Sequence, residues 1–134
     1  MARKSAREAA MCLLYQSNFN NESDLNALKN MVAEWDLDDN DILYIKDIIS
    51  GYNRNMKEID SIIESNSIGW KFDRIAKVDL SILRLAVYEI LYRDDIPVNV
   101  SINEAVELAK KYSGEKTGSF INGILGNFYR SLKK

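Results

Sequence analysis

Apolar residues recur every three or four positions along most of the chain, which is the spacing of one face of an α-helix. The pattern predicts a helix that starts at Ser5 and includes Asn18, a second from Ser23 or Asp24 to Trp35, and further helices over 42–63, 78–91, 101–112 and 120–132. The 42–63 stretch is either one long helix or two helices joined near Gly51. One proline, six glycines and no strand-like alternation of useful length argue against a sheet. We therefore expect an all-α fold, a compact bundle of about seven helices.

The predicted helix ends carry local signals. Ser5 with Glu8 and Ser101 with Glu104 have the spacing of a capping box, in which each side chain bonds the other's backbone N–H. The acidic stretch 36–41 predicts a loop that ends in a helix cap, since carboxylates suit a helix N-terminus. Glycines inside the last helix predict close approach of another helix, with close approach of a ligand backbone as the alternative.

The first helix has two chemically different sides. Its alanines and leucines fall in an arc of about 140°. Arg7, Met11, Tyr15 and Asn18 fall in an arc of about 80° on the opposite side. The pattern predicts that a guanidinium and a phenol face solvent together, beside the basic arm Arg3-Lys4.

Composition narrows the possible classes of protein. The 134 residues are 46% hydrophobic and 28% charged, an ordinary balance for one globular domain, here 1–134. A single Cys12 and the absence of His exclude a disulfide framework, a multi-Cys zinc site and His-based catalysis. No phosphate-binding glycine loop or EF-hand pattern is present. We expect a binding protein without a cofactor, not an enzyme. The chain has no apolar run of membrane-spanning length and no signal peptide, which predicts a cytoplasmic protein.

Charge is unevenly distributed behind a net charge of −2. Residues 1–7 carry three bases and no acid, and 22–41 carry seven acids and one base. Residues 110–134 carry six bases and one acid. If the two basic ends meet in the fold, an acidic chain can still present a basic face, because a polyanion responds to local potential. The alternative is that the basic ends are only solvated tails.

Four segments in order match a known pattern: residues 7–15 from Arg-Glu-Ala-Ala to Leu-Tyr, 83–97 ending in Asp-Ile-Pro, 102–112 opening with Ile-Asn-Glu-Ala, and 120–125 as Phe-Ile-Asn-Gly-Ile-Leu. They make the chain resemble the NusB family of bacterial transcription antitermination factors over essentially its whole length. The resemblance implies two small helical bundles packed together. It also implies binding of single-stranded boxA RNA in nascent ribosomal RNA, jointly with the ribosomal protein NusE. The pair would help the RNA polymerase elongation complex to pass terminators.

The resemblance also implies roles for individual residues. The expected RNA-binding residues are the basic arm and first helix, together with the start of the last helix: Arg3, Lys4, Arg7, Tyr15, Lys116, Phe120 and Asn122. Asp79 matches an acidic position that holds NusE, and Tyr88 and Glu89 follow it on the same helix. Lys116 stands where some relatives have an acid.

Other interpretations of these residues stay open on the sequence alone. Arg3 and Lys4 can be a tail, Tyr15 can pack on a neighbouring helix, and Phe120 can belong to the core. Asp79 suits a helix N-terminus by its charge alone. Two further functions remain possible for the chain: a stand-alone accessory RNA-binding domain, as found on some ribosomal RNA methyltransferases, and a helical adaptor that binds only proteins.

Overall fold

A computed structural model describes residues 3–16, 21–67, 69 and 71–132 of the chain. Within those residues it contains helices and turns but no strand. The elements in order are α1 (Lys4–Gln16), α2 (Asn21–Glu34), α3 (Asp39–Arg54), α4 (Met56–Asn66), the 3₁₀-helix η1 (Phe72–Arg74), α5 (Lys77–Tyr92), α6 (Val98–Tyr112) and α7 (Glu115–Leu132). The prediction of a helical bundle is confirmed.

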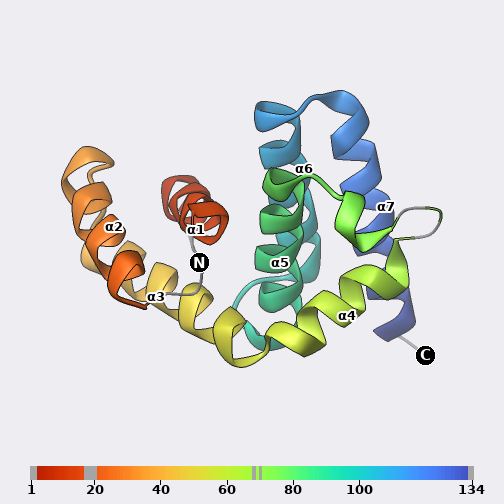
Figure 1. The fold of residues 1–134 in the computed structure, drawn as a ribbon, viewed down its shortest axis with the longest axis horizontal. Coiled ribbons are helices and arrows are strands. Elements are labelled where there is room, and N and C mark those ends of the chain that lie inside the picture. Colours follow the sequence, from red (N-terminus) through yellow and green to blue (C-terminus); the bar gives the residue numbers. More distant parts are fainter. Residues whose placement is uncertain (1–2, 17–20, 68, 70, 133–134) are drawn as a thin grey trace.

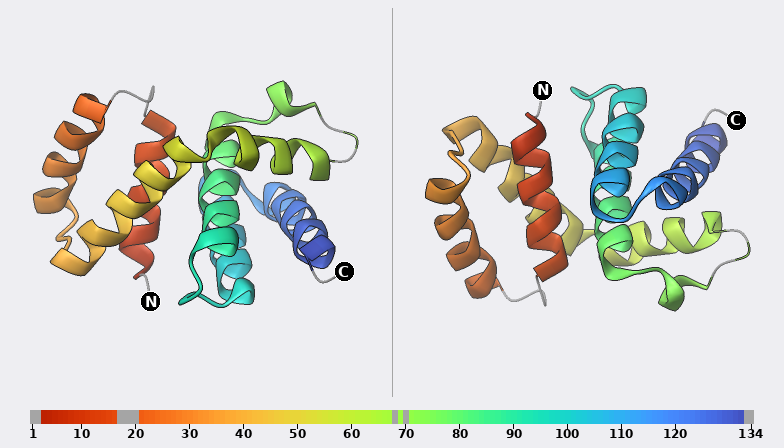
Figure 2. Two further views of the ribbon diagram at one scale, coloured as in Figure 1. Left: turned by 90° about the horizontal axis from the view of Figure 1, so that it is seen from below. Right: turned by 90° about the horizontal axis from the view of Figure 1, so that it is seen from above.

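The helices form two groups that share α5. Figure 1 shows α1, α2 and α3 on one side and α4 and α7 on the other, with α5 and α6 overlapping between them, and α6 packs on both α5 and α7. Figure 2 shows the same division from two further directions. Helix α5 contacts α1, α3, α4, α6 and α7. Its sequence is apolar on nearly all sides, which is typical of a helix that neighbours cover all round.

Several predicted helix boundaries are wrong, including the start of α7, which lies at Glu115. Helix α1 begins at Lys4, so Ser5 lies within it. Helix α6 begins at Val98 with Pro97 as its N-cap, and Ser101 is a buried residue one turn inside. The 42–63 pattern divides at Asn55 and not at Gly51. Sequence spacing finds a helix more reliably than it finds the helix end, because caps depend on side-chain geometry.

The acidic stretch behaves as predicted. Asp38 is the N-cap of α3, and it forms a capping box with Asp41. The Asp41 N–H donates to Asp38 Oδ1 at 2.8 Å, and the Asp38 N–H donates to Asp41 Oδ2 at 3.0 Å. This turn fixes the position of Asp41 against the start of α1.

One glycine allows two helices to approach closely. A Cβ atom on Gly51 of α3 would lie 2.2 Å from the Tyr88 ring of α5. Of the glycines predicted to serve close packing in α7, Gly118 meets Lys110 and Val106 of α6, whereas Gly123 has open space around it. Contact between helices therefore explains only part of that pattern.

Candidate nucleic-acid interface

Two of the residues predicted to bind RNA lie exposed on α1. The Lys4 side chain is 83% exposed, and its Nζ lies 3.6 Å from Glu104 Oε2 on α6. Tyr15 is 47% exposed at the other end of the helix. The prediction that the Tyr15 phenol reaches the surface is confirmed. Asn18, predicted on the same stripe, lies outside the described residues.

The prediction that Arg7 faces solvent is wrong. Arg7 is 2% exposed, and it makes a two-point ion pair with Glu89 of α5: Nε donates to Oε2 at 2.9 Å and Nη2 to Oε1 at 3.2 Å. Burial acts to lower the pKa of Arg7, but the hydrogen bond to Glu89 and the nearby charges of Glu89, Tyr44 and Glu104 together raise the net pKa. Met11 on the same stripe is also buried. The helix pattern correctly separated two sides of α1. The side that carries Arg7 and Met11, however, is covered by α5 and α6.

Glu89 is the centre of this buried polar cluster. It is fully buried, and it accepts hydrogen bonds from Ser101 Oγ at 2.7 Å and from the Tyr44 hydroxyl as well as from Arg7. Burial, followed by the Glu89 charge, raises the pKa of Tyr44 well above its ordinary value, so the phenol stays a donor. The prediction that Glu89 contacts a partner protein does not fit this position.

The prediction that Tyr88 contacts a partner protein does not fit its position either. It is 4% exposed, its ring packs on Gly51, and its hydroxyl donates to Asp47 Oδ1 at 2.9 Å. Burial, supported by the bond to Asp47, raises the pKa of Tyr88 to about 12. Tyr88 follows Asp79 on α5 by nine residues, so the two side chains leave the helix on opposite sides.

The arm residue Arg3 is docked on the protein. Its guanidinium bonds the Asp41 carboxylate, with Nε 3.0 Å from Oδ1 and a second contact from Nη2, and Nη2 lies 3.8 Å from Asp38. The hydrogen bond from Arg3 holds the pKa of Asp41 below its usual range. The N-terminal arm is therefore partly neutralised by the acidic turn before α3.

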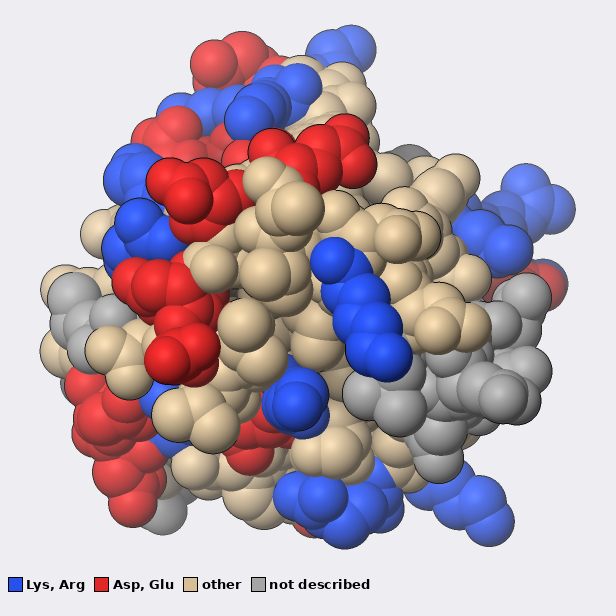
Figure 3. All heavy atoms as spheres, turned by 90° about the vertical axis from the view of Figure 1, so that its left-hand side faces the viewer, with Lys and Arg blue, Asp and Glu red and all other residues tan. Residues whose placement is uncertain are grey.

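The two basic ends of the chain meet only in part. Lys111 of α6 donates to Glu8 of α1 at 2.8 and 2.9 Å, and the Tyr112 hydroxyl donates to the same carboxylate. The start of the C-terminal basic block thus adjoins α1. The end of α7 lies away from the start of α1 in all views (Figures 1 and 2). Figure 3 shows, on the face turned toward the viewer, most of the acids gathered at one side and bases scattered over the whole face.

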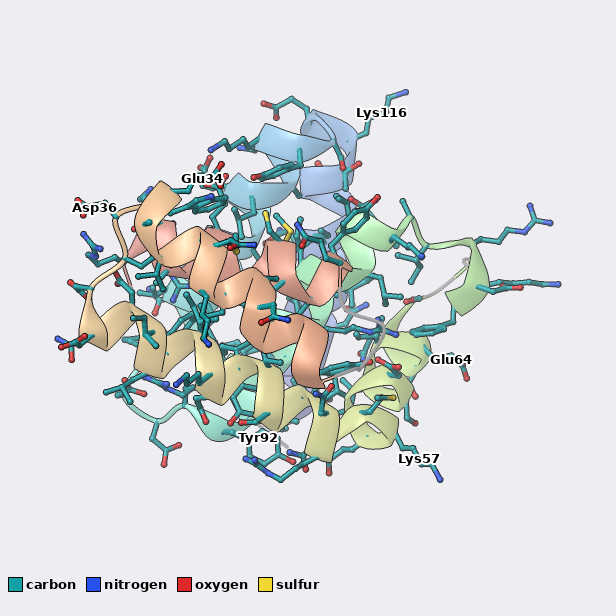
Figure 4. The ribbon with its side chains drawn as sticks, turned by 60° about the vertical axis from the view of Figure 1, so that its left-hand side comes forward. Glu34, Asp36, Lys57, Glu64, Tyr92 and Lys116 are labelled. Carbon is teal, nitrogen blue, oxygen red and sulfur yellow. The ribbon has the colours of Figure 1, made fainter. Side chains whose placement is uncertain are left out.

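The remaining predicted residues gather at the start of α7. Lys116 is exposed and projects away from the body of the protein (Figure 4). Phe120 is half-buried and packs against the core, while Asn122 is exposed. Two residues apart on a helix means about 160° around the axis, so the Phe120 and Asn122 side chains point to nearly opposite sides.

Asp79 lies beside the first turn of α7. It is 9% exposed, and its Oδ1 accepts a hydrogen bond from Ser113 Oγ at 2.8 Å. It shares a pocket of about 300 Å³ with Lys116 and Phe120. The residue predicted to hold a partner and two of those predicted to bind RNA are therefore neighbours in space.

Three residues with suitable chemistry escaped the sequence analysis. Lys111 and the 40% exposed Tyr112 lie against α1, and Arg74 lines the pocket beside Lys116. The run Lys110-Lys111-Tyr112, two cations followed by an aromatic residue, was a usable signal. Tyr112 also lies 3.8 Å from Cys12 Sγ, where burial raises the pKa of the half-buried thiol.

Other kinds of site find little support in the described part of the chain. It contains no group of three or more His, Cys, Asp or Glu side chains placed to hold a metal ion. None of its helices has both the length and the apolar content needed to cross a bilayer.

The geometry therefore defines an all-α protein whose candidate surface carries exposed cations and aromatic rings. The NusB family model matches residues 4–130, and the chain belongs to the NusB family. A transcription antitermination protein NusB from Acetivibrio thermocellus is 56% identical over 94% of this chain and 87% of its own length. A protein of the same name from Clostridium botulinum strain Loch Maree is 49% identical, covering 94% and 98%.

Solved structures agree with this assignment. NusB from T. maritima superposes with a TM-score of 0.83 at 34% identity, covering 97% of this chain and 93% of that one. A complex of the antitermination factors NusB and NusE with double-stranded RNA contains a chain with a TM-score of 0.83 and 32% identity, covering 96% of both. A chain in a crystal structure of a plectonemic RNA supercoil reaches 0.87 at 33% identity, covering 98% and 96%.

Proposed function

We propose that this protein is a transcription antitermination factor that binds boxA RNA of nascent ribosomal RNA transcripts together with NusE. It acts as one domain, residues 1–134, in the cytoplasm, as a component of the RNA polymerase elongation complex. It needs no cofactor and catalyses no reaction. The observation that carries the proposal is the similarity, over 96% of both chains, to a protein solved in complex with NusE and double-stranded RNA.

The exposed residues supply the chemistry that this function needs. Recognition of single-stranded RNA combines cations that contact phosphates with aromatic rings that stack on bases. Lys4 and Lys116 are exposed cations, and Tyr15 is an exposed ring. Arg3 joins them once phosphate replaces Asp41 as its partner. Arg7 supports this surface from below, because its pair with Glu89 fixes α1 on α5.

Contact with NusE is proposed at Asp79. Its carboxylate lies at the edge of the pocket next to Lys116, so protein and RNA would bind side by side. RNA and NusE that bind to neighbouring surfaces would contact each other. Each would then shield part of the other from solvent, which gives a physical basis for joint binding.

The test is a titration of labelled boxA-like single-stranded RNA with this protein, with and without NusE, at two salt concentrations. We expect tighter binding with NusE and an affinity that falls as salt rises, because phosphate contacts release counterions. A double-stranded RNA of the same sequence is the control for strandedness. Binding that does not depend on salt, or equal affinity for both RNAs, would contradict the proposal.

A further inference from the structure

Arg74 and Lys116 come from different elements and flank the same pocket. Arg74 ends η1 in the connection between α4 and α5, and Lys116 lies in the first turn of α7. The pocket between them has a volume of about 300 Å³, at the small end of the range for ligand sites. It is lined by Arg74, Ile75, Ala76, Asp79, Lys116 and Phe120, among others.

Arg74 and Lys116 have no carboxylate partner among the described residues, whereas most of the other arginines there have one. Arg3, Arg7, Arg84 and Arg93 are each ion-paired, with Asp41, Glu89, Asp60 and both Asp47 and Asp95 respectively. Among the described residues, neither the Arg74 guanidinium nor the Lys116 ammonium has an ion pair or side-chain hydrogen bond. Both residues are exposed. A cation that is not neutralised by the protein keeps its full attraction for phosphate.

The rest of the pocket suits a base. Ile75, Ala76 and the half-buried Phe120 make an apolar lining. The acidic group in the lining, Asp79, is mostly buried and bonded to Ser113. Glu115, beside Lys116 in sequence, lies 4.0 Å from Lys110 and so faces a cation of its own. An apolar lining between two free cations matches a nucleotide, which has a flat base between charged phosphates.

We propose that Arg74 is a further RNA-contacting residue and that, with Lys116, it holds one nucleotide of single-stranded RNA in this pocket. The base lies against Ile75 and Phe120, and the flanking phosphates face Arg74 and Lys116. This inference rests on the proposed function and extends it, because the RNA would then contact the connection between α4 and α5 as well as α7.

The test compares two substitutions three residues apart. Arg74→Ala removes a cation from this pocket. Lys71→Ala removes another exposed cation from the same connection, where it lines a different pocket. Each variant is titrated with fluorescein-labelled boxA-like single-stranded RNA over a range of salt, and thermal melting checks the fold. Arg74→Lys tests whether charge alone suffices.

We expect Arg74→Ala to weaken RNA binding about tenfold and to lower the salt slope by about 0.7, the value for one phosphate on a single strand. Lys71→Ala should change the affinity by less than about twofold, as an exposed charge outside the contact does. Arg74→Lys should retain most of the affinity, because it keeps the cation.

Equal affinities of Arg74→Ala and Lys71→Ala overturn the inference. If Lys116→Ala still weakens binding in that case, the proposed function stands without it. A wild-type protein that binds no RNA overturns both. Loss of NusE binding by Arg74→Ala, with RNA affinity unchanged, would assign the pocket to the protein partner and also overturn the inference.

Discussion

Arg7 and Glu89 form a two-point ion pair inside the protein, joining the N-terminal helix α1 to the central helix α5. The side chains are 3% and 0% exposed, so water does not compete for this pair. Tyr44 and Ser101 complete the coordination of the carboxylate from α3 and α6. Four helices therefore meet at one buried charge, and the surface that α1 presents depends on this contact.

Glu89→Gln should destabilise the protein by about 3–5 kcal/mol, the usual cost of leaving one member of a buried ion pair without its counter-charge. Urea unfolding at neutral pH measures the change. Glu58→Gln, an exposed carboxylate on α4, is the matched control and should alter stability little. Equal unfolding free energies for the two variants would show that the Arg7–Glu89 pair contributes nothing.

Tyr15→Ala should weaken RNA binding by about 5- to 150-fold, corresponding to the 1–3 kcal/mol of one base stacked on an aromatic ring. Tyr15→Phe should bind almost as well as the wild type, because the ring remains. Thermal melting should be unchanged in both, since the side chain is half exposed. Fluorescence anisotropy with labelled RNA provides the measurement, and Tyr92→Ala on α5 serves as the control ring. A Tyr15→Ala protein with wild-type affinity would remove Tyr15 from the interface.

Acid stability should depend on Arg3. The pKa of Asp41 is lowered in the folded state, so its contribution to stability is complete above the ordinary Asp pKa of about 3.9 and is lost as pH falls below it. Arg3→Ala should therefore be less stable than the wild type at neutral pH, and the two curves should converge on acidification. Chemical unfolding at a series of pH values tests this. The stability of Lys4→Ala should follow that of the wild type in parallel over the whole pH series. If the Lys4→Ala and wild-type curves also converged at low pH, the assignment of this pH dependence to the Arg3–Asp41 pair would be refuted.

Gly51→Ala should destabilise the protein by about 1–3 kcal/mol, the range for overpacking a filled interior. The added methyl group would meet the Tyr88 ring at 2.2 Å. Gly123→Ala in α7 is the control, because its surroundings are open and alanine favours a helix. It should be neutral or stabilising in the same thermal unfolding experiment, and a Gly51→Ala protein that matches it would contradict the close approach.

The sequence predicted which segments are helical and where the acidic turn caps α3, because both depend on residues close together in the chain. It also predicted that Tyr15 and Lys116 would be exposed. It failed for Arg7, Tyr88 and Glu89 for one common reason. A charged or phenolic group is ordinarily placed at the surface, and only a partner on another helix makes its burial stable.

The sequence by itself determined the helical class of this protein, its lack of histidine and its family, since periodicity, composition and motif order are properties of the chain alone. Only the tertiary structure decided which cations are available to a ligand. Arg7 is paired with Glu89, 82 residues further on, and Arg3 is paired with Asp41. Arg74 and Lys116 line one pocket, and neither has a carboxylate partner in the described part of the chain. Charge neutralisation acts through distance in space, and the order of residues does not specify that distance.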